Sequence, residues 1–405
     1  MELYFPVLLD GATGTELQKR GFTGGETAEA WVLEHPEAML DVQRRYVEAG
    51  SRVIYTPTFG ANRVKLEAAG IFNRVREFNL RLAAIAKEAA GDKALVAGDI
   101  APTGLFLAPL GTASFEELFE IYAEQAAALE EAGVDLFVIE TMMTLPEARA
   151  ALLAVRSVSK KPAIVSFTCD ENGRTLTGTD VAAALVVMQG MGADAFGLNC
   201  SVGPRDILAQ IERLRPWAEI PLLAKPNAGL PQMVGGKTVY DCPPEEFAAC
   251  AGEFAAAGVA YFGGCCGTDE GHIAALKSAL DGVKTAAPAP NYGGKMPCAS
   301  EKEAYLLESD IELPEPFACD GELADNIEDA QDEDAAMIAV RIDTLADAEV
   351  FADCQYAIKC PLAVVSDDVA ALEAALRAYQ GRALYSGSLG DDVLVPMAEK
   401  YGLVL

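Results

Sequence analysis

The feature that most constrains the fold is an alternation that runs from residue 6 to residue 280 of the 405-residue chain. Short apolar runs ending in Gly, Pro, Asn or Thr alternate with Ala/Glu/Leu-rich stretches of helical period, which is typical of repeated βα units. In the stretch 114–133, apolar residues recur at three- and four-residue spacing, and a glycine stands at the expected C-terminal cap. The eight strand-like runs are residues 6–11, 53–60, 95–100, 136–141, 163–169, 195–200, 222–227 and 261–267.

Eight strands with their crossovers predict an α/β fold, a (β/α)8 TIM barrel, and a doubly wound open sheet is the alternative on pattern alone. In a barrel the carboxyl ends of all strands open onto one mouth, where active sites lie. Polar and sulfur-bearing side chains stand at these strand ends, and we therefore expect them to face one mouth. They are Asp10, Thr58, Asn62, Asp99, Glu140, Thr141, Asn199, Cys200, Lys225, Asn227, Cys265 and Cys266.

Three of these residues are cysteines that could hold a metal ion. Cys200 follows the sixth run, and the adjacent pair Cys265 and Cys266 follows the eighth. Thiolates are soft ligands, and three protein ligands leave the fourth position of a zinc ion open for a substrate. The glycines beside the pair permit the tight backbone that lets two consecutive thiols face one metal. The alternative is that these cysteines are small core residues, the commoner place for a cysteine.

Charge and composition exclude several classes of partner. A formal net charge of −30 would repel nucleic-acid phosphates and anionic lipid, so neither nucleic acid nor a membrane is an expected partner. The N-terminal residues show no basic start followed by an apolar segment, and no later run is long enough to span a membrane. We therefore expect a cytoplasmic protein, with the ten cysteines as reduced thiols or metal ligands rather than disulfides.

An ordered series of motifs resembles the homocysteine S-methyltransferase family, which includes the homocysteine-binding module of cobalamin-dependent methionine synthase. The resemblance covers roughly residues 1–285, taken as the first domain. Its most specific parts fall at the sixth and eighth strands, where the family holds zinc. The motifs are LLDGATGTELQKRG (8–21), YTPTFGAN (55–62), GDIAPTG (98–104), ETMMTLPEARAAL (140–152), GLNCSVGP (197–204), KPNAGLP (225–231) and GGCCGT (263–268).

The resemblance implies a zinc enzyme that binds homocysteine as a thiolate and methylates it to methionine. Cys200, Cys265 and Cys266 match the family's zinc ligands. Glu140 matches the acidic residue directed at the substrate ammonium, and Asp10 borders the same end of the substrate. The remaining expected substrate-binding residues are Gly11 and Ala12, whose backbone N–H groups could hold the carboxylate, together with Thr141 and Asn199.

Some of these residues also have a purely structural interpretation. Asp10 before a glycine could be a turn residue, Glu140 could cap the following segment, and Asn199 could orient a loop. His272 lies in DEGHIAALKSAL, where Thr268 or Asp269 could be the helix N-cap, so we expect an exposed first-turn histidine rather than a ligand.

The chain continues past the barrel. Residues 286–304 are rich in Pro, Gly and Ala and read as a linker. Residues 305–405 alternate strand and helix again, which predicts a smaller C-terminal α/β domain, a partial barrel. This part resembles the start of the pterin-binding, folate-binding barrel of methionine synthase, without its pterin motifs. A partial barrel has open sheet edges that must be covered by the first domain or another subunit.

No corrinoid-binding motif occurs either, since neither histidine lies in a DxHxxG-like segment. We therefore expect the methyl group to come from methylcobalamin, a corrinoid carried by a separate protein. The C-terminal domain would then dock that partner or a second copy of the chain, or be a structural appendage. S-methylmethionine or a betaine-type donor, another acceptor thiol, and a non-catalytic zinc- or thiol-binding subunit remain alternatives.

Overall fold

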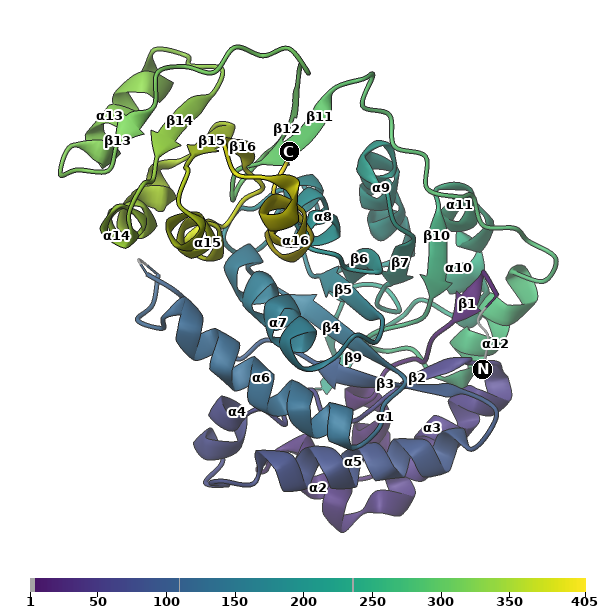
Figure 1. Ribbon diagram of the computed structural model, residues 1–405. Helices are drawn as coiled ribbons and strands as arrows, with labels where there is room; N and C mark the ends of the chain where they lie inside the picture. The colour runs from purple at the N-terminus through teal and green to yellow at the C-terminus, as the bar shows by residue number, and fades with distance from the viewer. Residues whose placement is uncertain (1–3, 109, 235–236) are drawn as a thin grey trace.

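The computed structural model describes residues 4–108, 110–234 and 237–405 (Figure 1). Its larger part is a nearly closed barrel of eight parallel strands, and each of the eight predicted runs overlaps one of them. In spatial order the strands are β1 (Val7–Leu8), β10 (Val259–Phe262), β7 (Leu222–Lys225), β6 (Ala195–Asn199), β5 (Ala163–Phe167), β4 (Leu136–Met142), β3 (Leu95–Ile100) and β2 (Val53–Tyr55). The predicted TIM barrel is thereby confirmed.

The seam between β1 and β2 is joined by backbone and side-chain hydrogen bonds, among them one from Ser51 Oγ to the Leu9 carbonyl at 2.8 Å. The Arg52 N–H donates to the Leu8 carbonyl at 2.7 Å, and the Tyr55 N–H donates to Asp10 Oδ2, also at 2.7 Å. The Asp10 carboxylate thus accepts a strand N–H that a neighbouring carbonyl would otherwise accept. This places a functional candidate in the wall of the barrel.

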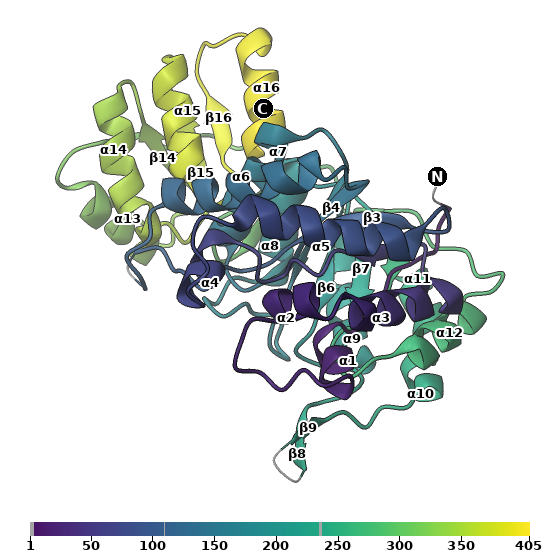
Figure 2. The ribbon, with the colours of Figure 1, turned by 90° about the horizontal axis from the view of Figure 1, so that it is seen from below.

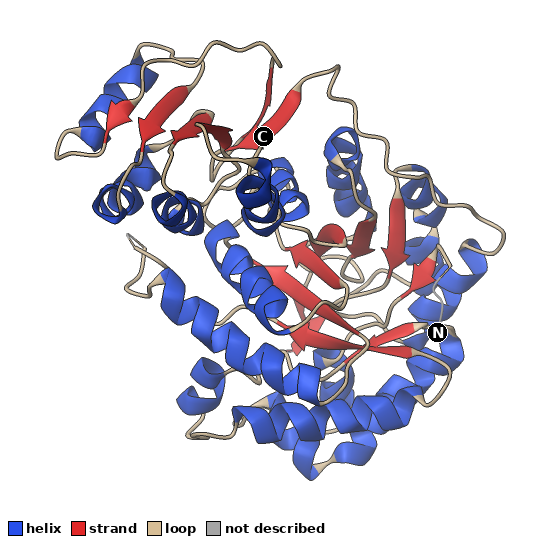
Figure 3. Ribbon diagram, viewed as in Figure 1, coloured by secondary structure: helices blue, strands red, loops and turns tan. Residues whose placement is uncertain are grey.

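Helices surround the barrel, as Figures 2 and 3 show. Helix α6 (Phe115–Glu131) lies in the predicted stretch 114–133: Ser114 caps it by accepting the Glu117 N–H, and Gly133 follows with a φ of +71°. The other helices of the barrel are α1 (Gly14–Lys19), α2 (Ala28–Glu34), α3 (Pro36–Ala49), α4 (Arg63–Ala68), α5 (Val75–Ala90), α7 (Leu145–Val158), α8 (Val181–Gly190), α9 (Pro204–Leu214), η1 (Arg215–Trp217), α10 (Pro244–Ala248), α11 (Ala251–Ala256) and α12 (Glu270–Ala279). Within the described ranges, no helix is long and apolar enough to cross a membrane.

Strand periodicity fixes which side chains point into the barrel. Ala97 and Val138 belong to a separate apolar cluster formed by inward-facing strand residues. Asp99 lies two residues beyond Ala97 on β3, and Glu140 lies two residues beyond Val138 on β4. Since alternate residues of a strand share a face, the two acids point inward at the mouth. Lys225, two residues beyond Leu223 on β7, does so by the same rule.

The smaller part is a four-stranded parallel sheet with helices, which confirms the predicted C-terminal α/β unit (Figure 3). A hairpin packs its apolar residues against one face of this sheet, and Val404 pairs with one edge. The hairpin begins inside the range 286–304 that was expected to be linker. The elements are β11 (Met296–Ala299), β12 (Ala304–Leu307), β13 (Phe317–Ala318), α13 (Leu323–Asp332), β14 (Ile338–Arg341), α14 (Leu345–Cys354), η2 (Gln355–Ala357), β15 (Leu362–Val365), α15 (Val369–Ala378), β16 (Leu384–Ser386) and α16 (Asp391–Tyr401); β8 (Gln232–Val234) and β9 (Lys237–Val239) form a further hairpin in the barrel.

One fully buried arginine joins the two parts. Arg149, on α7 of the barrel, donates to Gln380 Oε1 and to the Leu376 carbonyl, each at 3.0 Å. Leu376 lies in the last turn of α15, so the guanidinium caps a helix end of the C-terminal unit. The Figure 1 view places α15 beside α7. Burial lowers the pKa of Arg149 to about 10, which still leaves it charged at neutral pH.

We predict that Arg149→Ala lowers the free energy of unfolding by about 3 kcal/mol, because it leaves a cavity and buried carbonyls without donors. The control is Arg377→Ala, which removes a more exposed ion pair with Glu116 across the same interface and should cost less than about 1 kcal/mol. Urea denaturation measures both. Equal losses in the two variants would contradict this account of the interface.

Candidate metal and substrate site

Three thiols meet at the mouth of the barrel. The Sγ atoms of Cys200, Cys265 and Cys266 all lie within 4.8 Å of one another. Cys200 directly follows β6, and the cysteine pair follows β10 after two glycines. Zinc–sulfur bonds of about 2.3 Å at tetrahedral angles put sulfur atoms about 3.8 Å apart, so this donor set fits a zinc ion with small adjustments.

The turn after β6 is held in an unusual backbone conformation. Cys200 and Ser201 have φ angles of +64° and +58°, and Thr141 on the nearby β4 has one of +60°. Such left-handed conformations are costly for residues other than glycine and persist only where the surroundings enforce them. The Asn199 side chain helps to hold Thr141 in its conformation. Its Oδ1 accepts the Thr141 N–H at 2.9 Å, and its Nδ2 donates to Thr141 Oγ1 at 2.7 Å.

Two glycines of the cysteine turn leave space that a side chain would fill. A Cβ atom on Gly264 would lie 2.4 Å from Thr268 Oγ1. One on Gly267, which has a φ of +83°, would lie 2.4 Å from the Cβ of Tyr240. The prediction that glycines make the tight cysteine turn possible therefore has a steric basis in the structure.

The three thiols share hydrogen bonds that favour one thiolate. Bonds from Cys200 and Cys265, with a further one from Tyr240, lower the pKa of Cys266 to about 3 against the opposing effect of burial. The hydrogen bonds with Cys200 and Cys266, and burial, raise the pKa of Cys265 well above its usual value. By contrast, burial raises the pKa of Cys169, which follows β5, to about 12. The cluster is prepared to bind a cation, and Cys169 is an inert thiol.

A cavity of about 280 Å³ opens beside the sulfur atoms and carries an excess of acidic groups. Its lining includes the carboxyl groups of Asp10, Glu29, Asp99 and Glu140, against the single ammonium group of Lys225. Burial raises the pKa of Glu29, and it raises that of Asp99 more strongly. A cationic group of a ligand would relieve this excess of negative charge.

Asp10 is already paired within the protein. Its Oδ1 lies 2.7 Å from Lys225 Nζ, its Oδ2 accepts the Tyr55 N–H, and both members of the ion pair are about 4% exposed. The ammonium of Lys225 also lies 3.7 Å from the centre of the Tyr55 ring. Sequence reasoning noted Lys225 as a strand-end residue but did not include it among the site residues. The available signal is its position on β7, two residues beyond the inward-facing Leu223, which places its side chain inside the barrel.

Three other polar groups of the cavity have no hydrogen-bond partner. They are Asp99 Oδ1, Glu140 Oε2 and the Tyr55 hydroxyl, all of them buried. Burial raises the pKa of Glu140 to about 7, because Lys225 offsets only part of the desolvation and Asp10 and Cys200 add negative charge. Buried polar atoms normally have partners, so these three atoms could form hydrogen bonds with a ligand in the cavity.

Two expected substrate contacts differ in the structure. Asn199 is 1% exposed and does not line the cavity, because its amide is used on Thr141 and on Ser166, whose Oγ donates to it at 2.8 Å. The Ala12 N–H donates to Thr268 Oγ1 at 3.1 Å, so this N–H is not available for a carboxylate. Gly11, Ala12 and Thr141 do line the cavity.

The expectation of an exposed His272 is wrong. The side chain is 7% exposed, because it completes the cap of α12 with Asp269 and its Nε2 lies 3.0 Å from the Cys242 carbonyl. Asp269 is the N-cap, one of the two candidates that the sequence offered. The bond to Cys242 holds the segment that carries Tyr240 next to the cysteine turn.

Comparisons with known proteins match the barrel part of the chain. The family model described as homocysteine S-methyltransferase matches residues 7–280. Methionine synthase of Mycobacterium leprae (strain TN) is 33% identical over 289 residues, and that of Mycobacterium tuberculosis (strain ATCC 25618 / H37Rv) is 32% identical over 293 residues. These alignments cover 67% and 68% of this chain but 24% of each relative. The chain therefore spans about a quarter of the length of these relatives.

Solved structures of a homocysteine methyltransferase are similar to the barrel part of this chain. The metallated form of the homocysteine methyltransferase MmuM from Escherichia coli superposes with a TM-score of 0.59 at 26% identity. The match covers 68% of this chain and 96% of MmuM. The oxidized form gives a TM-score of 0.58.

Proposed function

Because the chain belongs to the homocysteine S-methyltransferase family, we propose that it binds L-homocysteine as a thiolate on zinc and methylates it to methionine. The observation that carries this proposal is the cluster of three sulfur atoms at the edge of a cavity with unpaired acidic groups. Cys200, Cys265 and Cys266 would hold the zinc ion. When bound there, zinc would keep the sulfur of the substrate in the thiolate form at neutral pH, where a free thiol is mostly protonated.

The acidic interior of the cavity would bind the amino group of the substrate. An ammonium group has three N–H donors, and the cavity offers three buried oxygen atoms without partners, on Tyr55, Asp99 and Glu140. Asp10, paired with Lys225, would keep the cavity wall in place and contribute charge at longer range. This arrangement selects an amino acid that carries a thiol over a simple thiol.

Apolar side chains around the mouth favour a large methyl donor carried by a partner. They lie in segments that follow barrel strands, and between 38% and 71% of each residue is exposed: Phe59, Leu110, Leu176, Leu230, and Met233 on β8. Exposed apolar groups gathered around a site mark a surface for another molecule. We therefore favour a methyl-corrinoid on a separate protein as donor, with residues 305–405 as an additional docking unit joined to the barrel of 1–285 through 286–304. Reduced thiols in the site favour a cytoplasmic location.

The test of the proposed function is methionine formation by zinc-loaded protein from L-homocysteine with methylcobalamin, and in parallel with S-methylmethionine. Turnover with methylcobalamin supports the proposal in full. Turnover with S-methylmethionine alone would support homocysteine as the acceptor but contradict a methyl-corrinoid as the donor. Zinc binding without methionine from either donor would favour a non-catalytic zinc- or thiol-binding subunit or another acceptor.

We predict that affinity for L-methionine, which has no thiol, rises about ten-fold between pH 6 and pH 8. Glu140, with a pKa of about 7, is mostly neutral at pH 6 and mostly ionised at pH 8, and only the ionised form pairs with the ammonium. Isothermal titration calorimetry on reduced, metal-free protein measures this, because the pKa of Glu140 includes the effect of the Cys200 thiol without a metal. Glu140→Gln should bind more weakly with little dependence on pH. The same pH slope in that variant would exclude Glu140 as its source.

A further inference from the structure

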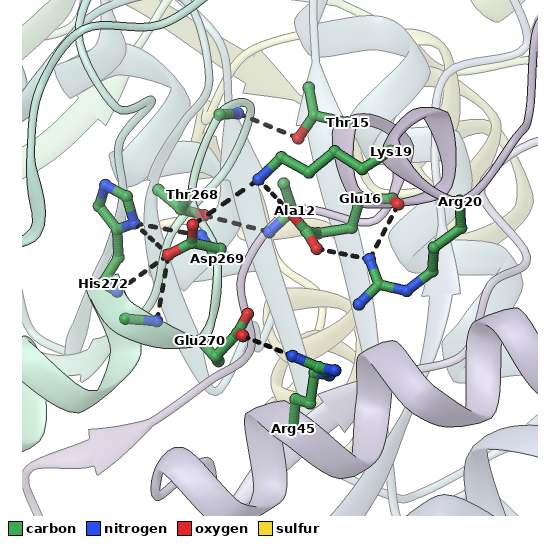
Figure 4. A network of polar contacts seen from close by, with 12 residues as sticks. Ala12, Thr15, Glu16, Lys19, Arg20, Arg45, Thr268, Asp269, Glu270 and His272 are labelled. Atoms are coloured by element: carbon green, nitrogen blue, oxygen red, sulfur yellow. Dashed lines mark hydrogen bonds and ion pairs between the residues drawn. The ribbon is translucent and has the colours of Figure 1, made fainter.

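The cysteine turn and the loop that begins the substrate pocket are joined by a buried hydroxyl group. Thr268, 0% exposed, donates from Oγ1 to the Cys265 carbonyl at 2.8 Å and accepts the Ala12 N–H on the same oxygen at 3.1 Å. One side chain thus contacts both the carbonyl of a metal-ligand candidate and the backbone of a second segment that lines the cavity. Figure 4 shows Thr268 beside Ala12, with Asp269 and His272 next to it.

Further contacts reinforce this connection. The Gly264 N–H donates to the Asp10 carbonyl at 3.0 Å, and the Gly267 N–H donates to Thr15 Oγ1 at 3.2 Å. The buried Tyr46 hydroxyl donates to the Ala12 carbonyl at 2.7 Å. Next to Thr268 in the chain, Asp269 Oδ2 lies 3.6 Å from Lys19 Nζ, a contact that Figure 4 also shows.

The hydroxyl of Thr268 is nevertheless distinctive among these contacts. It uses its donor on one segment and an acceptor lone pair on the other, so neither valine nor alanine can replace it. The Thr268 N–H donates to the same Cys265 carbonyl at 3.1 Å, which fixes the residue within the turn. Gly264 leaves the space that the Thr268 side chain occupies, since a Cβ on Gly264 would lie 2.4 Å from that oxygen.

We propose that Thr268 is a positioning residue that holds the segment 263–268 and the segment 10–15 as one unit, and so sets the metal ligands at a fixed distance from the pocket for the amino-acid end of the substrate. The inference rests on the proposed function for its substrate. It assigns Thr268 no contact with the reacting atoms. Its consequence is that losing one hydroxyl weakens metal binding and substrate binding together.

The test compares Thr268→Val, nearly the same in shape, with Thr268→Ser, which keeps the hydroxyl. Competition with a chelator for zinc alone should show a zinc affinity roughly ten-fold lower in Thr268→Val. The KM for homocysteine should rise by a similar factor, about ten-fold, while kcat falls less. Thr268→Ser should stay within about three-fold of the unmodified protein in both quantities.

Ser300→Ala is the matched control, because Ser300 is equally buried and its hydroxyl accepts two backbone N–H groups in the turn between β11 and β12. It should lose stability but keep zinc affinity. If Thr268→Val does not fold, Thr15→Val removes the neighbouring bond to Gly267 and should lower zinc affinity by about three-fold. The proposal would be overturned if Thr268→Val bound zinc as tightly as Ser300→Ala does. It would also be overturned if Thr15→Val bound zinc as tightly as the unmodified protein does. The zinc measurement needs no homocysteine, so it tests the role of Thr268 independently of the methionine assay, which tests the proposed function.

Discussion

Cys265→Ser should abolish zinc binding and methyl transfer, whereas Cys169→Ser should leave both in place, and this is the largest effect that we predict. Both cysteines lie near the carboxyl end of a barrel strand, yet only Cys265 belongs to the cluster of sulfur atoms within 4.8 Å. A serine hydroxyl does not ionise at neutral pH and is a poor ligand for zinc, so two thiolates would remain where three are needed.

Loss of a partner outside the ligand set commonly costs 10–100-fold in metal affinity, and we expect loss of a ligand itself to cost roughly a thousand-fold or more. Zinc content after dialysis against a chelator, followed by the methionine assay, measures both effects. Cys169→Ser should retain full zinc content, although a hydroxyl in that buried position costs some stability. Methyl transfer by a zinc-free Cys265→Ser protein would show that the reaction does not require a metal at this site.

The second large effect concerns the buried ion pair between Asp10 and Lys225. Lys225→Met should lower the free energy of unfolding by about 3–5 kcal/mol, because the buried Asp10 carboxylate would lose its countercharge. Asp10→Asn should be costly for the complementary reason, since the ammonium would then be unpaired. Denaturant unfolding of both variants gives the two losses.

The double variant Asp10→Asn/Lys225→Met identifies the cause. Because neither charge is then left alone, its loss should be well below the sum of the two single losses. Lys161→Met is the control, since the pair of Lys161 with Glu130 is about one-third exposed on both sides and should contribute less than about 1 kcal/mol. Additive losses in the double variant would show that the two residues act independently.

The sequence predicts much of this fold because its signals are local. Strand runs and amphipathic helices alternate with clear breaks, so the eight strands and the cap of α6 follow from period and turn residues alone. The convergence of Cys200 with the pair at 265 and 266 follows from the same pattern, because barrel strand ends share one mouth.

The features that sequence reasoning missed depend on contacts between distant segments. Lys225 reaches Asp10 across 215 positions, and the Ala12 N–H is taken by a threonine 256 positions away. His272 is buried because a segment 30 positions earlier folds over it. The start of the hairpin at Met296 falls in the predicted linker because the glycines and prolines just before it are typical of a loop, whereas its burial against the C-terminal sheet becomes visible only in three dimensions.

The central claim is that homocysteine binds through its sulfur to a metal held by three cysteines. X-ray absorption at the zinc edge tests it directly, with zinc-loaded protein measured before and after addition of L-homocysteine. We expect three sulfur ligands at about 2.3 Å without substrate and four with it. An unchanged set of three sulfur ligands at saturating homocysteine would contradict the account, because the substrate thiol would then be activated elsewhere.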